Sequence, residues 1–515
     1  MKRGVAARAR ALPSGPFLML ITLAFALGAC RAREGNARPE RVILFSMDTV
    51  REESLTPSTA PELERIAREG VRFDRFYTAS TFTLPAHMSI FTGLDPEAHG
   101  VWENGFALAP GVVTLAERLS LAGYRTQAFH EGTHVAAGFG FARGFDAYTA
   151  MDRKQLVRGA GLDRVLEWMR GAGDEPYFLF LHTYEAHYPY GGWDRWVAEN
   201  TGRRATLSET ERQRIEESLA LGPARAGESP DLRVQCFLAN QLSEGADALP
   251  RCPPNRAPSG FLQSRHFADD TAALVRSYRD RIRELDAAIG RIRRLLADQD
   301  QWEDTLLLVT SDHGEAFFEH GLAKHGYVPY EEVLRVPLIV SHPRSLGDRQ
   351  GSRVDVLAWH LDLAPTILGW VGEPPLGQGR DLGPWLRGQT GVEPETEVHP
   401  LVLPIPGRPG RLPPRRAVVG RSWKYVQGHP LFGDDAWLLF DLGSDEGEAR
   451  NLRATNLEEG ERLSAALASY RARLKRHAPI HRASGRPVEP GVSVDEAPDL
   501  APEDMQALRA LGYVE

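Results

Sequence analysis

Cysteine is scarce in this sequence: Cys30, Cys236 and Cys252 are the 3 cysteines among 515 residues. None of them lies near a motif of catalytic type. Internal repeats and long low-complexity runs are absent, and the apolar (42%) and charged (25%) fractions are those of an ordinary globular protein. The chain is longer than the size at which one hydrophobic core usually stops growing, so we expect one large α/β unit with an appendage, or two domains.

Apolar runs long enough to span a membrane are also absent after residue 29. The run from Phe17 to Ala26 follows a basic head and is shorter than the roughly 20 apolar residues of a spanning helix. This pattern predicts an export signal over residues 1–29. The LGAC that ends at Cys30 resembles the bacterial lipoprotein box, in which the cysteine is acylated. We therefore expect a lipid-anchored protein of the bacterial cell envelope with a polar tether at 30–40; plain secretion is the alternative.

Positive charge is not in excess, since the formal net charge is −8 at pH 7. Cleavage after residue 29 removes four basic side chains and leaves a net charge of about −12, so nucleic acid is not an expected partner. Export would bring the protein into an oxidising compartment. There the two remaining cysteines, Cys236 and Cys252, are expected to form a disulfide and not to bind a metal. Both thiols lie in a segment without strand pattern at 191–265, which we interpret as an insertion that forms either a pocket wall or a surface excursion.

Three continuous apolar runs are typical of parallel strands that are buried on both faces, and they occupy residues 41–50, 177–187 and 304–315. Helical patterns lie between them, over residues 54–70, 113–123 and 276–298. This alternation predicts an α/β fold with a doubly wound, mostly parallel sheet flanked by helices. Ligands of such sheets bind at the carboxyl ends of the strands.

A Pro- and Arg-rich connection at 390–415 predicts a boundary with a smaller C-terminal α+β unit. We accordingly divide the chain into a catalytic domain at 41–390, a subdomain with a small sheet and a helix at 391–480, and a tail at 481–515. The tail contains a pattern typical of a short amphipathic helix.

Polar side chains gather where the expected strands end. Asp48, His187, Asp312 and His313 lie at or just past these ends. Each alone has an ordinary explanation, as a helix cap or a structural imidazole. Together, two carboxylates and imidazole nitrogen suit a divalent cation such as Mg²⁺, Mn²⁺, Ca²⁺ or Zn²⁺. The sequence therefore predicts one divalent metal site at this edge.

The segment STFTLPAHMSIFTG at 80–93 is rich in hydroxyl groups. We expect its Leu84-Pro85 turn to set Thr83 at the mouth of the sheet. A helix starting near Ala86 would then direct backbone N–H groups and its positive dipole end toward a bound oxyanion.

An ordered series of motifs resembles the sulfatase branch of the alkaline phosphatase superfamily. The series includes ILFSMDTVR (43–51), TLPAHMSIFTG (83–93), PEAHGV (96–101), FLHTYEAHYPY (180–190), VTSDHGEAFFEHG (309–321), LRVPLIV (334–340) and WLLFDLGSDEGEARNL (437–452). Each motif alone is weak, but the ordered set is very specific and covers about residues 40 to 475. The last of them is similar to the C-terminal sulfatase segment, in which a strand leads into a helix.

The resemblance implies a ligand set. Asp48, Asp312 and His313 match the metal ligands of the family, and Thr83 falls where the family keeps its attacking residue, itself a metal ligand. In a sulfatase that residue is a Cys or Ser that becomes formylglycine within a CxPxR pattern. Thr83 cannot be oxidised to that aldehyde, and His87 stands where the Arg would be.

Further residues take supporting roles by the same resemblance. His187 matches the residue that contacts the ester oxygens or the leaving group, and it could donate a proton to that oxygen. Lys324 or His325, depending on a one-residue alignment choice, lies where related enzymes place a cation that faces the substrate anion. His87 either replaces the lost Arg in substrate binding or is structural.

The companion motif at 123–134 offers His130 and His134 but no Lys, and we take His130 as a candidate for substrate binding. A second metal site, as in two-zinc relatives, would use a different set of residues. That set is His182, Glu185 and His320.

Thr83 favours phosphorus over sulfur. A threonine hydroxyl activated beside a cation can attack a phosphoryl centre and form a phosphothreonyl enzyme that water opens, whereas sulfo-threonine lacks the exit that an aldehyde hydrate provides. We therefore expect a metal-dependent hydrolase of phosphate mono- or diesters that acts through a covalent Thr83 intermediate. Sulfuric ester hydrolysis without formylglycine and an inactive binding protein on the same fold are the alternatives. The expected substrate is a small anionic ester or an envelope glycan or lipid.

Overall fold

The computed structural model describes residues 38–188 except 103, residue 190, and residues 267–488 with gaps at 318, 321–322, 390–395, 404–413, 429–436 and 483–484. The described residues from Pro39 onward belong to one compact unit. Cys30, the predicted Cys236–Cys252 disulfide and the C-terminal tail from residue 489 onward lie outside these ranges. Across the described ranges, no helix is both long enough and apolar enough to cross a bilayer.

The main sheet has eight strands in the order β11-β2-β10-β7-β1-β6-β4-β5. They are β1 (Arg41–Met47), β2 (Val71–Tyr77), β4 (Arg125–His130), β5 (Ala147–Ala150), β6 (Tyr177–Thr183), β7 (Thr305–Ser311), β10 (Leu338–Ser341) and β11 (Ser352–Trp359). Only β10 pairs antiparallel with its neighbours in this sheet; the other pairs are parallel. The predicted fold class, a mostly parallel sheet in an α/β protein, is confirmed.

The three strands expected from the sequence lie side by side at the centre, in the order β6-β1-β7. Every residue of β1 is buried, which explains its continuous apolar run. Each strand stops before its expected end, because polar residues and a turn follow. After β1, for example, Thr49 has a φ of 61°, a left-handed conformation that cannot continue a strand.

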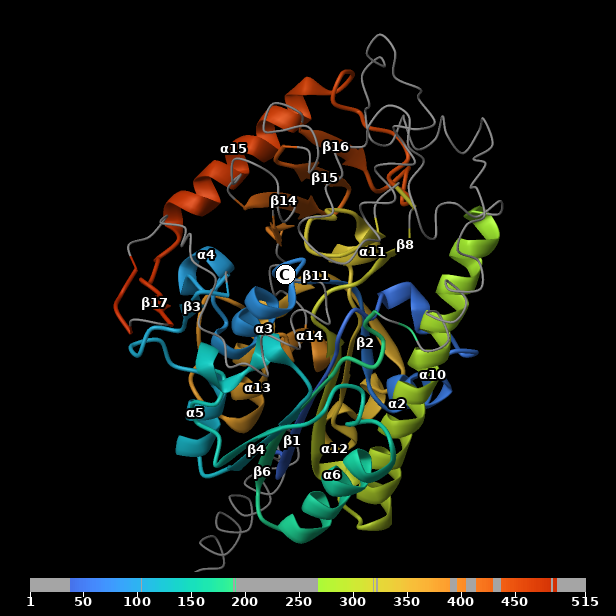
Figure 1. Ribbon diagram of the computed structural model, residues 1–515, viewed down its shortest axis with the longest axis vertical. Coiled ribbons are helices and arrows are strands. Elements are labelled where there is room, and N and C mark those ends of the chain that lie inside the picture. Colours follow the sequence, from blue (N-terminus) through green and yellow to red (C-terminus); the bar gives the residue numbers. More distant parts are fainter. Residues whose placement is uncertain are drawn as a thin grey trace, which may run out of the picture. The chain divides into compact units, whose positions relative to one another are not determined.

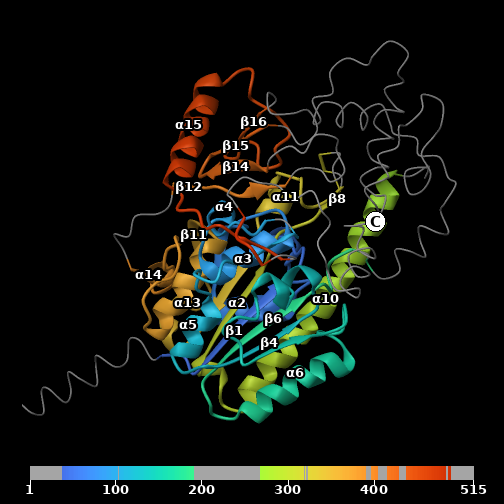
Figure 2. The same ribbon diagram turned by 60° about the vertical axis from the view of Figure 1, so that its left-hand side comes forward.

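Two layers of helices cover the sheet (Figures 1 and 2). The longer helices of the described chain are α2 (Pro61–Glu69), α3 (Thr83–Thr92), α5 (Leu115–Leu121), α6 (Gly159–Ala172), α10 (Phe267–Asp298), α13 (Leu363–Val371) and α15 (Leu457–Arg473). Helices α3, α5 and α13 share a core with Val42 and Leu44 of β1, whereas α2, α6 and α10 pack on the opposite face with Ile43 and Phe45. Alternate residues of one strand thus enter two different cores.

The helix expected over 54–70 is shorter than the sequence indicates. A 3-10 turn occupies Glu52–Ser54, and α2 begins only at Pro61. Proline suits the first turn of a helix because its missing N–H would have no partner there.

A second, antiparallel sheet has the strand order β12-β14-β15-β16, and β13 also pairs with β14. Its strands are β12 (Glu397–Val398), β13 (Leu401–Val402), β14 (Arg415–Gly420), β15 (Trp423–Val426) and β16 (Leu438–Asp441). Helix α15 follows β16, as the C-terminal motif predicts. The domain boundaries at 390 and 480 stay predictions.

Short elements complete the described chain. They are the helices α4 (Pro96–His99), α11 (Glu331–Leu334), α12 (Pro343–Leu346) and α14 (Gly383–Leu386), and the paired strands β3 (Phe106–Ala107) with β17 (Ile480–His481) and β8 (Ala316–Phe317) with β9 (Ala323–Lys324).

A buried ion pair connects the second sheet to the helical layer of the first. Arg416 of β14 donates to both carboxylate oxygens of Asp95, at 2.8 and 2.5 Å, and Tyr470 of α15 donates to the same carboxylate at 2.8 Å. Burial by itself would raise the pKa of Asp95, but the charge and hydrogen bonds of Arg416 outweigh it and hold the pKa below its ordinary value. The carboxylate therefore stays ionised in the folded protein.

We predict that Asp95→Asn lowers the free energy of unfolding by about 3 kcal/mol at neutral pH, because the buried Arg416 then loses its bidentate carboxylate partner and keeps only Glu97, at 3.1 Å. The folded pKa of Asp95 is depressed, so its contribution is complete above the unfolded value of about 4 and is lost as the pH falls through the folded value. Urea unfolding of both proteins at several pH values measures this: the difference between them should shrink only under acid conditions.

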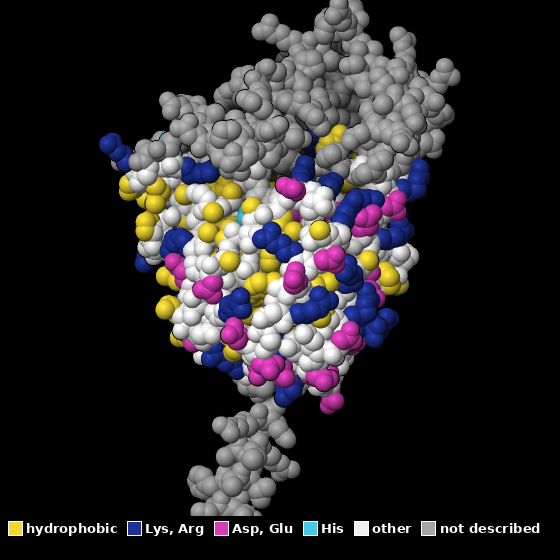
Figure 3. Space-filling view, turned by 60° about the horizontal axis from the view of Figure 1, so that its bottom comes forward, with side chains coloured by type: hydrophobic (Ala, Val, Ile, Leu, Met, Phe, Trp, Pro, Cys, Tyr) yellow, Lys and Arg dark blue, Asp and Glu magenta, His cyan; other side chains and the backbone are white. Residues whose placement is uncertain are grey.

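Acidic and basic side chains are interspersed on the face shown in Figure 3. The exposed pair Arg291–Asp163 (2.7 Å) supplies the control for the buried one, because water screens exposed pairs. Asp163→Asn should change the unfolding free energy by less than about 1 kcal/mol. An equal loss in both variants would contradict a special role of the Asp95–Arg416 pair.

Candidate metal centre and active site

The register of the central strands brings two carboxylates together. Met47, the last residue of β1, pairs with Ser311, the last residue of β7. Asp48 and Asp312 therefore leave neighbouring strands at the same level, and both are fully buried. One carboxylate oxygen of Asp312 accepts from the backbone N–H of Thr49 (3.2 Å) and of His313 (2.8 Å), which fixes the orientation of the group.

Thr83 lies opposite these carboxylates at the start of α3. The helix begins at Thr83 and not near Ala86, so this expectation is wrong by one turn. Pro85 occupies the first turn, where its lack of an N–H costs no hydrogen bond. Thr83 does not cap the helix with its side chain. Instead its hydroxyl lies 3.2 Å from Asp48 Oδ2 and 3.3 Å from His313 Nε2.

His313 has the protonation pattern of a metal ligand. Its Nδ1 lies 3.0 Å from the carbonyl oxygen of Gly314 and donates to it, so Nε2 carries the lone pair. Burial lowers the pKa of His313 to about 4, and the nearby His325 acts in the same direction. A neutral imidazole therefore faces Thr83 and the two carboxylates.

The carboxylates have free ligand atoms. Asp48 Oδ1 and Asp312 Oδ2 are buried without a hydrogen-bond partner within the described part of the chain. Burial, and next the charge of Asp312, raise the pKa of Asp48 well above its ordinary value. The ligand atoms of Asp48, Asp312 and His313 lie within 4.8 Å of one another. A divalent cation fits this donor set, because it would supply both free oxygens with a partner and offset their repulsion.

Two further histidines adjoin the group. His87 Nε2 lies 2.9 Å from the hydroxyl of Ser46, and its Nδ1 lies 2.9 Å from the carbonyl oxygen of Thr83, one helical turn back. Both ring nitrogens are thus occupied, which favours the structural alternative for His87. His182 Nε2 lies 3.3 Å from Asp48 Oδ2.

The predicted catalytic residues from other loops are placed at the same edge. His325 stacks on the ring of His313 at 4.2 Å, and its Nδ1 lies 2.9 Å from Glu315. The ring of His187 lies 5.1 Å from that of His325. Lys324 has a φ of 65° and its ammonium lies over the ring of Tyr188 at 5.1 Å. Of the two aligned alternatives, His325 thus contacts the candidate metal ligand His313, and the choice between them stays a prediction.

His130 occupies a different neighbourhood. It ends β4, pairs in register with His182, and its ring lies 4.4 Å from that of Tyr148. The ring of His134 packs on Phe82 at 4.8 Å, next to Thr83. The described contacts of His130 are therefore with neighbouring strands of the sheet. Its role in substrate binding stays a prediction.

The predicted second metal set is not brought together. Glu185 binds Arg158 and Arg281, whereas His320 lies 3.7 Å from Glu332 and stacks on a tyrosine. Within the described ranges, the side-chain groups that could hold a metal place His182 and His320 in different clusters and leave Glu185 out. The strand ends alone did not show that Arg281 of α10 and Arg158, just before α6, bind Glu185.

The sequence interpretation missed a basic pair in the loop between β5 and α6. Arg153 Nη2 lies 2.8 Å from His187 Nδ1, and Lys154 Nζ donates to the carbonyl oxygen of His187 at 2.9 Å. Burial, then the charge of Arg153, lower the pKa of Lys154 to about 8. Two adjacent basic residues after a strand end could have indicated this pair. The strand itself, Ala147–Ala150, was not recognised because it has no clear apolar run.

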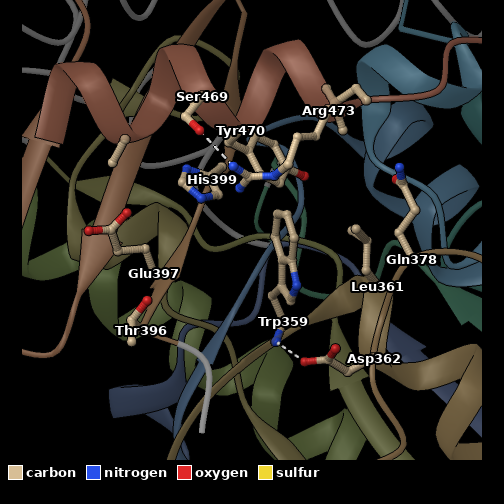
Figure 4. A pocket seen from close by; sticks show the side chains of 12 residues that line it. Trp359, Leu361, Asp362, Gln378, Thr396, Glu397, His399, Ser469, Tyr470 and Arg473 are labelled. Atoms are coloured by element: carbon tan, nitrogen blue, oxygen red, sulfur yellow. Dashed lines mark hydrogen bonds between the residues drawn. The ribbon is translucent and has the colours of Figure 1, made fainter.

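A separate cavity of about 470 Å³ lies between the end of β11 and α15 (Figure 4). Trp359, His399, Tyr470 and Arg473 are among its lining residues. None of the predicted catalytic or metal-binding residues lines it, so it is distinct from the edge that carries Thr83.

Comparison with known proteins extends these observations. Residues 42–373 match the model of the sulfatase family. The chain is 24% identical over 366 residues to the uncharacterized sulfatase YidJ of Escherichia coli, covering 63% of this chain and 66% of that protein. It is 22% identical over 497 residues to an N-acetylglucosamine-6-O-sulfatase of Bacteroides thetaiotaomicron, covering 85% and 87%. The crystal structure of a phosphonate monoester hydrolase of Agrobacterium radiobacter has a TM-score of 0.65 at 21% identity, covering 89% of this chain and all of that one.

The fold and these similarities define a hydrolase that acts on sulfuric or phosphoric esters. The family match spans well over half of the sequence. The chain therefore belongs to the sulfatase family.

We predict that Asp312→Asn weakens metal binding by more than about 10- to 100-fold. Losses of that size follow the removal of a residue that only orients a metal ligand, whereas Asp312 would bind the metal itself. The reason is that the amide removes one of the two charges that would hold the cation. Metal content after dialysis, measured by mass spectrometry, checks this. Asp163→Asn, the same chemical change at an exposed site, should retain the metal; equal retention in both variants would contradict the ligand assignment.

Proposed function

We propose that the protein hydrolyses phosphate mono- or diesters through a covalent intermediate on Thr83, with a divalent cation held by Asp48, Asp312 and His313. The observation that carries this proposal is the position of the Thr83 hydroxyl, within hydrogen-bonding distance of both Asp48 and His313. A cation bound there would polarise the ester and favour the ionised hydroxyl.

The residues of the chain divide the chemistry between them. The Thr83 hydroxyl, which donates a hydrogen bond to Asp48, bonds through its oxygen to phosphorus as the bond from phosphorus to the leaving oxygen breaks, and the hydroxyl proton passes through solvent to the leaving oxygen. Burial and the charge of Arg153 lower the pKa of His187 well below its ordinary value, so this imidazole is neutral. Its Nδ1 accepts a hydrogen bond from Arg153 Nη2, and its Nε2–H donates one to the leaving oxygen. Water then attacks the phosphothreonine and returns the Thr83 hydroxyl.

Threonine at this position favours phosphorus because a phosphothreonine can be opened by water, whereas a sulfatase aldehyde cannot form from threonine. The similarity to a phosphonate monoester hydrolase is consistent with this choice. Sulfuric ester hydrolysis is the second candidate, since the relatives include an N-acetylglucosamine-6-O-sulfatase. An anionic ester, free or on an envelope glycan or lipid, is the proposed substrate class.

We expect Thr83→Ala to lose roughly 10³-fold or more in kcat, because it lacks the attacking oxygen, while Thr83→Ser keeps that oxygen and measurable activity. Turnover of nitrophenyl phosphate, bis-nitrophenyl phosphate, a phosphonate ester and nitrophenyl sulfate across several metals measures this. Acid quenching of the wild type should trap one phosphoryl group on Thr83. Full activity of Thr83→Ala would overturn the nucleophile, and clear preference for the sulfate would overturn the phosphorus assignment.

We further propose that residues 1–29 direct export and that Cys30 carries a lipid anchor in a bacterial envelope. The LGAC sequence supports this. In a bacterial host, Cys30→Ser should move the protein from the membrane to the soluble fraction, because a protein without an acyl chain has no anchor. Cys236→Ser, the matched cysteine change, should leave it membrane-bound. Retention of Cys30→Ser at the membrane would contradict the anchor.

A further inference from the structure

Arg153 lies against the candidate leaving-group residue. Its Nη2 is 2.8 Å from His187 Nδ1 and 2.7 Å from the carbonyl oxygen of Tyr188. Its guanidinium carbon lies over the ring of Tyr184 at 5.0 Å. Three residues that follow the end of β6 thus hold one arginine at the carboxyl edge of the sheet.

A buried carboxylate positions the segment that carries Arg153. Glu131, which follows β4, accepts from the hydroxyl of Thr183 (2.9 Å), from the backbone N–H of Tyr184 (2.7 Å) and from the backbone N–H of Leu156. It therefore connects the end of β6 to the loop between β5 and α6. In that loop Lys154 has a φ of 62°, a conformation that costs energy outside glycine and is often found at functional sites.

The two ring partners of Arg153 connect it to the candidate metal ligands. The ring of Tyr184 packs edge-on against that of His182 at 4.9 Å, and His182 Nε2 lies 3.3 Å from Asp48 Oδ2. The ring of His187 lies 5.1 Å from that of His325, which stacks on His313 at 4.2 Å. Arg153 is thus separated from Asp48 and His313 by only two rings on each path.

The charge balance of the site defines what Arg153 can do. Asp48 and Asp312 carry two negative charges, which one divalent cation cancels. A phosphate monoester, with two charges near pH 7, then needs another cation, and a guanidinium offers several N–H donors to planar sets of oxygens. Lys324 is a further cation nearby, because its ammonium lies over the ring of Tyr188, the residue whose carbonyl oxygen binds Arg153.

We propose that Arg153 binds the non-reacting oxygens of the ester and makes the site select dianionic phosphate monoesters over monoanionic diesters. This inference rests on the function proposed above. It assigns specificity to a residue outside the motifs that define the family resemblance.

The test compares kcat/KM for nitrophenyl phosphate, a dianion, and bis-nitrophenyl phosphate, a monoanion. Arg153→Ala should lose about 10- to 100-fold on the monoester and less than about threefold on the diester, because a charge-assisted hydrogen bond to the second negative charge is lost. Arg153→Lys should fall between, since it keeps the charge but not the planar donors. Arg164→Ala, which removes an exposed arginine of α6, should match the wild type.

Equal losses on both esters would overturn the proposal, because an arginine that only orients His187 affects every leaving group alike. Unchanged kinetics in Arg153→Ala would overturn it as well. The melting temperature of each variant shows whether it is folded.

Binding of inorganic phosphate separates this inference from the proposed function. Calorimetry on the metal-loaded Thr83→Ala protein, with and without Arg153→Ala, should show Kd rising about 10- to 100-fold. An unchanged Kd overturns the role of Arg153 even if the wild type hydrolyses phosphate esters. Conversely, a raised Kd in a protein whose wild type cleaves no phosphate ester supports Arg153 as an anion ligand and overturns the proposed reaction.

Discussion

The site depends on the repulsion between two carboxylates that the sheet holds together in a dry interior. Asp48 and Asp312 follow paired residues of adjacent parallel strands, so neither can move away without breaking the ladder between β1 and β7. Burial makes this repulsion strong, because little water screens it. A divalent cation relieves it, and the backbone N–H groups that bind Asp312 and the imidazole of His313 complete the arrangement. The repulsion between the two carboxylates in the folded protein therefore favours binding of a metal ion.

The surroundings of this pair are rigid where the chemistry needs a fixed geometry. Thr83 begins a fully buried helix, and His87, one turn later, is bonded to Ser46 of β1, so helix and strand are held in register. The neighbouring residues His325, His187 and Arg153 come instead from loops. Catalysis on a rigid sheet with specificity in the loops is the usual division of labour in α/β proteins.

Much of the fold followed from local patterns. The apolar runs of β1, β6 and β7 and the motif order predicted a parallel α/β sheet, and the carboxyl-end rule placed Asp48 beside Asp312. The helix start at Thr83 was mispredicted because proline is compatible with both a turn and a first helical turn. Glu185 was assigned to a metal because its arginine partners lie about 27 and 96 residues away in sequence, beyond any local pattern.

The sequence alone determined the residue types, their order and the strands that carry them, because periodicity and motif spacing are local properties. It also showed that position 83 holds a threonine, which sets the range of possible chemistry. Only the tertiary structure decided which residues meet. His325 contacts the candidate ligand His313, and Arg153 reaches His187 from a loop with no motif. Neither contact follows the spacing of a helix or a strand, and both depend on how the loops pack at the edge of the sheet.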